Sequence, residues 1–122
     1  HSKLDPLIAA ADESIRKRDY QSFSDIVEKC IDALRAHVKW ENGEKGILHE
    51  IEEKHPELSE DIIELRNDHL FLIQKLKRAY HFAKDEDEQA FVLFERFKIR
   101  RKEHVFHEDE LDVMIHTIQL RK

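Results

Sequence analysis

The chain has very few residues that interrupt helices. Only two of its 122 residues are Gly and two are Pro, whereas 39% are charged. Sheets of short strands need many turns, and turns draw heavily on Gly and Pro. A chain poor in both and rich in charge is typical of long amphipathic helices. We therefore expect an all-α fold in one domain, residues 1–122, which is either a whole protein or one domain of a longer one.

Other scarcities restrict the classes of function. Cys30 is the only cysteine, so no disulfide forms within the chain, which is compatible with a reducing compartment such as the cytoplasm. No apolar run approaches the roughly 20 residues that a membrane helix requires. The net charge of −6 argues against nucleic acid as the main partner, because phosphate binding needs a basic face. We expect a cytoplasmic protein that binds neither membranes nor nucleic acid.

Apolar residues recur at helical spacing in four segments. These segments lie at about residues 4–18, 21–55, 58–83 and 89–118. We expect Asp5 and Pro6 to begin the first helix, and Gly43 and Gly46 to kink or break the second. The connections are short, and short connections favour antiparallel neighbours. The sequence therefore predicts an up-down-up-down antiparallel four-helix bundle.

Metal-binding residue types interrupt three of the apolar stripes. The interrupting residues are His37, Glu41, His69, His104 and Glu108. The spacing His-x-x-x-Glu occurs twice, and residues four apart lie one above the other on a helix, about 5–6 Å apart. Burying carboxylates inside a bundle is costly unless cations compensate them. The pattern predicts a metal site in the interior.

The positions of these residues along their helices support the same prediction. His37 lies about 17 residues after the first turn, His69 about 15 before the last turn, and His104 about 17 after it. Both turns are at the same end of an up-down bundle. At a rise of about 1.5 Å per residue, the three His therefore lie at one level, roughly 25 Å from that end. The first helix reaches this level near His1.

This arrangement resembles the hemerythrin-like, or HHE cation-binding, domain family over essentially the whole chain. That family places a His early on the first helix, His-x-x-x-Glu on the second, a His on the third, and His-x-x-x-Glu or a close variant on the fourth. The matching residues are His1, His37, Glu41, His69, His104 and Glu108. The resemblance implies two iron ions bridged by Glu41 and Glu108, with the histidines as terminal ligands. It also implies a bridging oxo, hydroxo or water.

The chain departs from the oxygen-carrying members of that family at the third and fourth helices. Those members have a second His four residues after the His of the third helix, where this chain has Ile73. They also use an Asp five residues after the His of the fourth helix. Asp109 has that spacing here, but Glu108 fits the inward face better. With fewer His ligands, one iron would keep an open or water-filled position.

The ligand from the first helix has alternatives. Pro6 fits poorly in a helix that extends back to residue 1, because it lacks an N–H group and crowds the carbonyl of Ser2. If His1 is not a ligand, either Asp5 replaces it or this helix provides none.

The function implied by the resemblance is a di-iron domain that binds or senses dioxygen, nitric oxide or iron. Two alternatives stand beside it. One is an enzyme, namely a di-iron oxidase, a peroxidase-like protein or an iron-sulfur-centre repair protein. The other is a helical interaction domain without metal. A protein partner or a second copy of the chain is compatible with each.

The remaining polar features have simpler interpretations. We expect the other five histidines to lie on the surface: His49, His55, His81, His107 and His116. Cys30 is predicted to be a buried, inert thiol. The basic run at residues 98–102 is interpreted as a solvated face, with an anionic partner as the alternative.

Overall fold

The computed structural model describes residues 3–42 and 46–121, with the backbone alone at residues 40–42 and 120–121. Within this part of the chain there are five α-helices, one 3-10 helix and no strand. The elements are α1 (Leu4–Arg16), α2 (Tyr20–Asn42), α3 (Ile47–Lys54), η1 (Pro56–Leu58), α4 (Ser59–Lys84) and α5 (Gln89–Arg121). The predicted all-α fold is confirmed.

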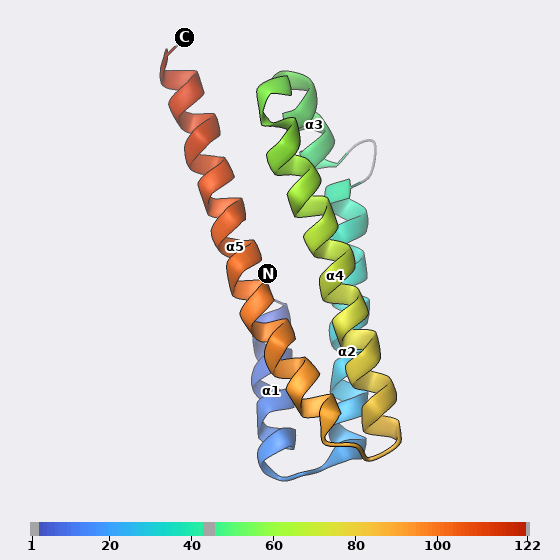
Figure 1. Ribbon diagram of the computed structural model, residues 1–122. Coiled ribbons are helices and arrows are strands. Elements are labelled where there is room, and N and C mark those ends of the chain that lie inside the picture. The colour runs from blue at the N-terminus through green and yellow to red at the C-terminus, as the bar shows by residue number, and fades with distance from the viewer. Residues whose placement is uncertain (1–2, 43–45, 122) are drawn as a thin grey trace.

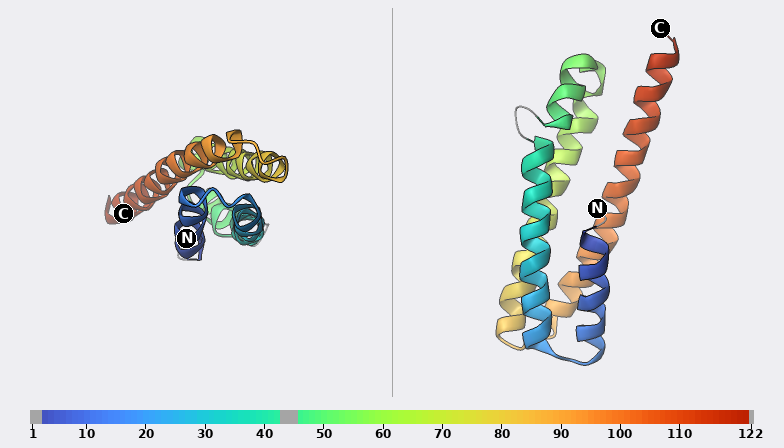
Figure 2. Two further views of the ribbon diagram at one scale, coloured as in Figure 1. Left: turned by 90° about the horizontal axis from the view of Figure 1, so that it is seen from below. Right: turned by 180° about the vertical axis from the view of Figure 1, so that it is seen from behind.

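The four longer helices, α1, α2, α4 and α5, pack side by side (Figure 1). The α1–α2 turn and the α4–α5 turn lie at the same end, and each of these four helices runs opposite to the previous one of the four. Seen from below, α1 and α2 form one side and α4 and α5 the other (Figure 2). The short α3 lies at the opposite end, beside the start of α4. In the described chain, no helix is both long enough and apolar enough to cross a membrane.

The ends of α1 differ slightly from the prediction. The helix begins at Leu4, as the predicted segment does, but Lys3 and not Asp5 precedes it, and Pro6 is its third residue and not its first. The first four N–H groups of a helix have no partner within it, which is why proline is tolerated there. After α1, Arg18 has a φ of 53° and turns the chain back. Asp19 Oδ1 then accepts a hydrogen bond of 3.1 Å from the amide N–H of Ser22 and caps the start of α2.

The second predicted segment is broken where its glycines lie. The helix α2 ends at Asn42, and α3 begins at Ile47 with Gly46 in extended conformation before it. Gly43 lies outside the described residues. The helix α4 starts at Ser59 directly after η1, as the sequence predicted. The predicted kink or break is therefore confirmed at Gly46.

Buried apolar side chains of the described residues form two separate clusters. The larger lies between the four long helices near the turns, and its largest members are Phe23, Phe94 and Phe97, all fully buried. The ring centroids of Phe23 and Phe94 are 5.4 Å apart in an edge-to-face arrangement. The smaller cluster contains Leu48, Leu58, Ile62, Leu65 and Leu111. Along both α4 and α5, a buried His lies between the two clusters.

Ion pairs attach α1 to α5. Lys98 Nζ lies 2.8 Å from Asp12, and Arg101 lies 2.9 Å from Asp5. Burial acts to lower the pKa of Lys98, but its hydrogen bonds to Asp12 and Glu95 outweigh that effect and raise the pKa. Interpreting residues 98–102 only as a solvated face is therefore wrong for Lys98 and Arg101, which hold a neighbouring helix.

The larger cluster predicts a clear contrast between two residues of α5. Replacing Phe94, which is fully buried, with Ala should lower the free energy of unfolding by about 3–5 kcal/mol. Val92 is 52% exposed, so the control Val92→Ala should change it by less than about 0.5 kcal/mol. Urea denaturation followed by circular dichroism measures both. Equal losses in the two variants would contradict the described packing.

Cys30 allows a second test of the interior. Burial raises the pKa of its thiol to about 12, although the charge of Arg101 opposes the effect. Because only the thiolate reacts, labelling by a disulfide reagent at pH 8 should be at least about a thousandfold slower than for an exposed cysteine. Full reaction should appear once urea unfolds the chain. Fast labelling of the folded protein would show that Cys30 is accessible.

Candidate metal centre

Two histidines from neighbouring helices meet in the interior. His69 on α4 is 0% exposed and His104 on α5 is 2% exposed. Their Nε2 atoms are 3.0 Å apart, and their ring centroids are 4.6 Å apart. Helical spacing puts each of them in the buried stripe of its helix, His69 between Leu65 and Leu72. The predicted meeting of these two residues is found in the structure.

A third helix brings His37 to the same place. His37 on α2 is half-buried, and its ring centroid lies 5.9 Å from that of His69, with the two planes 78° apart. The three histidines therefore share one level of the interior, as their distances along the sequence predicted. The described part of α1 does not reach this level, since its 13 residues extend only about 20 Å from the turn.

His104 lies between two carboxylates. Its Nε2 atom is 3.1 Å from Oε1 of Glu108, and its Nδ1 atom is 3.4 Å from Oδ2 of Asp68. Burial alone would lower the pKa of the imidazole. The hydrogen bonds and negative charges of Glu108 and Asp68 outweigh burial and raise the pKa of His104 above its usual value. The side chain of Glu108 is 21% exposed, so this pair lies at the edge of the interior.

Asp68 is an organising residue that the sequence analysis missed. It is 5% exposed, and Oδ1 accepts a hydrogen bond of 2.9 Å from Arg100 while Oδ2 faces His104. Nδ1 of His107 lies 3.7 Å from the same Oδ2 atom. Asp68 occurs three residues after Leu65 and four before Leu72. That spacing lies on the buried face of α4 and could have identified it.

The atoms around His104 Nε2 pose a problem of hydrogen bonding. Both Nε2 of His69 and Oε1 of Glu108 approach it, at 3.0 and 3.1 Å. A single ring N–H can donate to only one of them, and a neutral imidazole has one N–H. If His104 donates from Nδ1 to Asp68, its Nε2 lone pair points at the other two atoms. An N–H of His69 could then donate to this lone pair, and a proton or a metal ion shared by the three atoms would also satisfy Glu108.

Two of the six predicted ligands cannot be placed. His1 lies outside the described residues, and so does the side chain of Glu41, whose backbone lies in the last turn of α2. Among the side chains that are described, no group of three or more His, Cys, Asp or Glu residues is arranged to hold a metal ion. Asp5, the alternative to His1, is exposed and pairs with Arg101. The metal centre stays a prediction.

The histidines predicted to lie on the surface do so with one exception. His49, His81, His107 and His116 are exposed or half-exposed, whereas His55 is 6% exposed. The prediction for His55 is wrong because it ends α3 and precedes η1, where the chain turns back on itself. The sequence signal for this turn was Pro56.

Comparisons with known proteins add no relatives. A scan against protein-family models, a search of curated proteins and a search of solved structures each gave no match to this chain.

The position of Asp68 predicts the titration of its neighbour. In the metal-free protein, Asp68→Asn should lower the pKa of His104, because the variant removes one of two negative charges that favour the imidazolium. Histidine ring NMR signals followed against pH measure the effect. The control Glu60→Gln, in the exposed first turn of α4, should leave the pKa of His104 as it was. An unchanged value in Asp68→Asn would show that the carboxylate does not act on this ring.

Proposed function

We propose that the chain is a hemerythrin-like four-helix bundle that holds two iron ions and binds or senses dioxygen, nitric oxide or iron. The metal ligands in this proposal are His37, Glu41, His69, His104 and Glu108, with His1 as a sixth from the first helix. When bound, the iron ions would share an oxo, hydroxo or water ligand.

The convergence at His104 is the observation that supports the proposal most. Two atoms bound to one metal at right angles, each about 2.1 Å from it, are about 3 Å apart. The contacts of His104 Nε2 with His69 Nε2 and Glu108 Oε1, at 3.0 and 3.1 Å, have that spacing. Imidazole nitrogens and carboxylate oxygens together are a donor set that suits iron. These spacings and this donor set support the proposal of iron at the level of His104.

Asp68 supplies a second supporting feature. A metal-bound histidine almost always donates its other ring N–H to a carboxylate, a carbonyl or water, which fixes its orientation and tautomer. Nδ1 of His104 lies 3.4 Å from Asp68, and Arg100 holds that carboxylate from the other side. The Nε2 lone pair is then directed to the level where His37 and His69 also lie. Asp68 acts in this proposal as a positioning residue.

Iron at this site would supply an open or water-filled position that binds dioxygen or nitric oxide. The chain supplies the surroundings, because Leu65 and Leu72 flank His69 on α4 and keep bulk water away from it. A small ligand fits this setting better than a large substrate would.

A metal-free helical domain is the second candidate, and one observation favours it. The contact of 3.0 Å between the two Nε2 atoms also satisfies the geometry of a direct N–H···N hydrogen bond. In that case the paired histidines are a polar element of the core and bind nothing. Only metal binding separates the two candidates.

Iron reconstitution provides the test. Under anaerobic conditions the protein should take up about two ferrous ions per chain, and a visible absorption band should develop on exposure to dioxygen. Glu108→Gln keeps the shape of the side chain but removes a charged ligand, so it should lower iron uptake by at least about tenfold. The control His116→Ala changes an exposed histidine of the same helix and should bind iron normally.

Two results would contradict this proposal. One is wild-type protein that stays colourless and iron-free. The other is equal iron uptake by Glu108→Gln and the wild type, which would place any bound iron elsewhere.

A further inference from the structure

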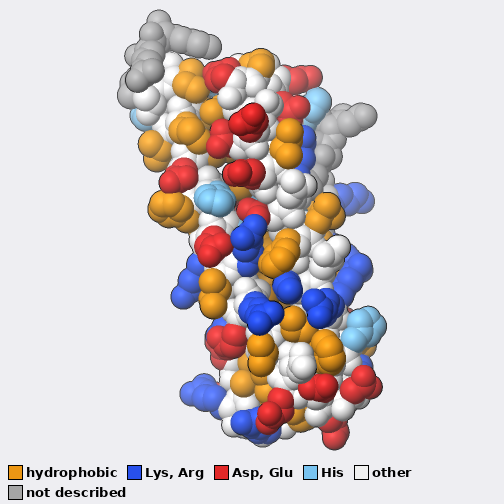
Figure 3. Space-filling view, in the orientation of Figure 1, with side chains coloured by type: hydrophobic (Ala, Val, Ile, Leu, Met, Phe, Trp, Pro, Cys, Tyr) orange, Lys and Arg blue, Asp and Glu red, His pale blue; other side chains and the backbone are white. Residues whose placement is uncertain are grey.

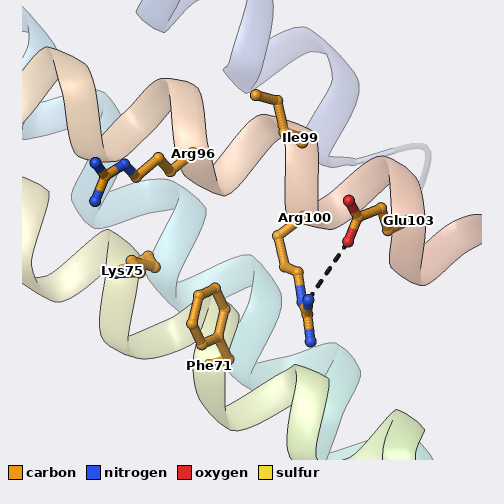
Figure 4. Close-up of a pocket in the computed structure, with 6 residues that line it drawn as sticks. All are labelled: Phe71, Lys75, Arg96, Ile99, Arg100 and Glu103. Carbon is orange, nitrogen blue, oxygen red and sulfur yellow. Dashed lines mark hydrogen bonds and ion pairs between the residues drawn. The ribbon is translucent and has the colours of Figure 1, made fainter.

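A pocket lies on the outer face of the molecule, between α4 and α5. Its volume is about 290 Å³. The residues that line it are Phe71, Lys75, Arg96, Ile99, Arg100 and Glu103 (Figure 4). Two come from α4 and four from α5, so the packing of these two helices forms the pocket. It is on the surface and distinct from the buried histidines.

Three of the side chains around the pocket are cationic. Nζ of Lys75 lies 5.0 Å from the ring centroid of Phe71, and the guanidinium of Arg100 lies 5.1 Å from it. Figure 4 shows the Phe71 ring between these two residues. Such cation–π contacts hold both cations beside the ring. Phe71 thus fixes two positive charges at the pocket.

The cations differ in how far their charge is already compensated. Arg100 forms ion pairs with Asp68 at 2.9 Å and with Glu103 at 3.4 Å. Among the described residues, neither Lys75 nor Arg96 forms an ion pair with a carboxylate. These two charges remain available to a ligand. Glu103 is the acidic side chain at the rim, and its partner is Arg100.

The positive character of the pocket contrasts with the chain as a whole. The net charge is −6, yet Lys and Arg side chains gather across the middle of this face, with Asp and Glu more frequent towards its two ends (Figure 3). A local concentration of one sign in an oppositely charged protein attracts counter-ions to that place. The apolar surfaces of Phe71 and Ile99, 36% and 60% exposed, lie beside these charges.

We propose that this pocket binds a small organic anion, with a phosphate or carboxylate group on an apolar body. Arg96 and Lys75 would bind the anionic group, since a guanidinium matches phosphate and carboxylate oxygens in a bidentate manner. Phe71 and Ile99 would contact the apolar body. A volume of about 290 Å³ is near the lower end for small-molecule sites, so the ligand is a small one.

Lys75 and Arg96 are the pocket cations to replace in a test of anion binding. Arg100 should be left in place, because it also holds Asp68 beside His104. Lys75→Gln and Arg96→Gln instead remove charges that have no carboxylate partner among the described residues. Lys29→Gln is the matched control, since Lys29 is exposed on α2 and is not among the lining residues.

Binding of phenyl phosphate to the metal-free chain, followed by amide chemical shifts at low ionic strength, tests the proposal. Shift changes should concentrate around Phe71 and Ile99, and the double variant of Lys75 and Arg96 should bind at least about tenfold more weakly. Lys29→Gln should bind as the wild type does. Benzoate should bind at the same residues, and inorganic phosphate should bind several-fold more weakly than phenyl phosphate.

Three results would overturn the proposal. The first is the absence of shift changes at the pocket with phenyl phosphate and with benzoate. The second is an equal loss of affinity in the double variant and in Lys29→Gln, which would mean diffuse attraction to any cation. The third is equal affinity for benzyl alcohol and phenyl phosphate, which would mean that the charges take no part. None of these readouts depends on iron.

Discussion

The burial of two imidazoles in contact is the constraint on which the rest of the structure depends. His69 and His104 lie inside the molecule, between a large apolar cluster near the turns and a small one at the other end. A buried polar group costs free energy unless it is hydrogen-bonded or bound to a cation. The chain therefore surrounds this pair with Asp68 and Glu108, and Arg100 in turn neutralises Asp68. An apolar pair at this level would have joined the two clusters into one core without the free-energy cost of burying polar groups.

The same constraint connects the interior to the surface. Arg100 reaches Asp68 from the outer face of α5 and also lies against Phe71 at the rim of the pocket. The guanidinium of Arg100 thus takes part in the hydrogen bonding around His104, through Asp68. It also contributes to the positive surface between α4 and α5. Lys98 and Arg101, on the other side of α5, attach α1 instead. The helix thus directs a run of basic residues in the sequence to two neighbouring helices, α1 and α4.

Much of the fold and the histidine layer could be predicted because both follow from local rules. The apolar period and the scarcity of breakers gave the helices, and Gly46 and Pro56 marked real interruptions. The common level of His37, His69 and His104 followed from counting residues between turns, because a helix rises by a constant amount per residue.

What the sequence did not reveal depends on tertiary packing. Asp68 has the spacing of a buried position, but a charged residue there is expected to be solvated unless its partner Arg100 is known. The burial of His55 follows from the path of the chain around η1, and the pairing of residues 98–102 depends on which helix lies beside each. Pro6 is the third residue of α1 and not, as predicted, the first. Every position of the first turn tolerates proline, so the residue type alone does not give the position at which the helix begins.

The most direct test of the metal centre is anomalous diffraction at the iron absorption edge from crystals grown with ferrous iron. We expect two neighbouring peaks among the side chains of His69, His104 and Glu108, with the two imidazole nitrogens directed at the metal. A density map without anomalous peaks at this level, in which the two rings are hydrogen-bonded to each other, would contradict it.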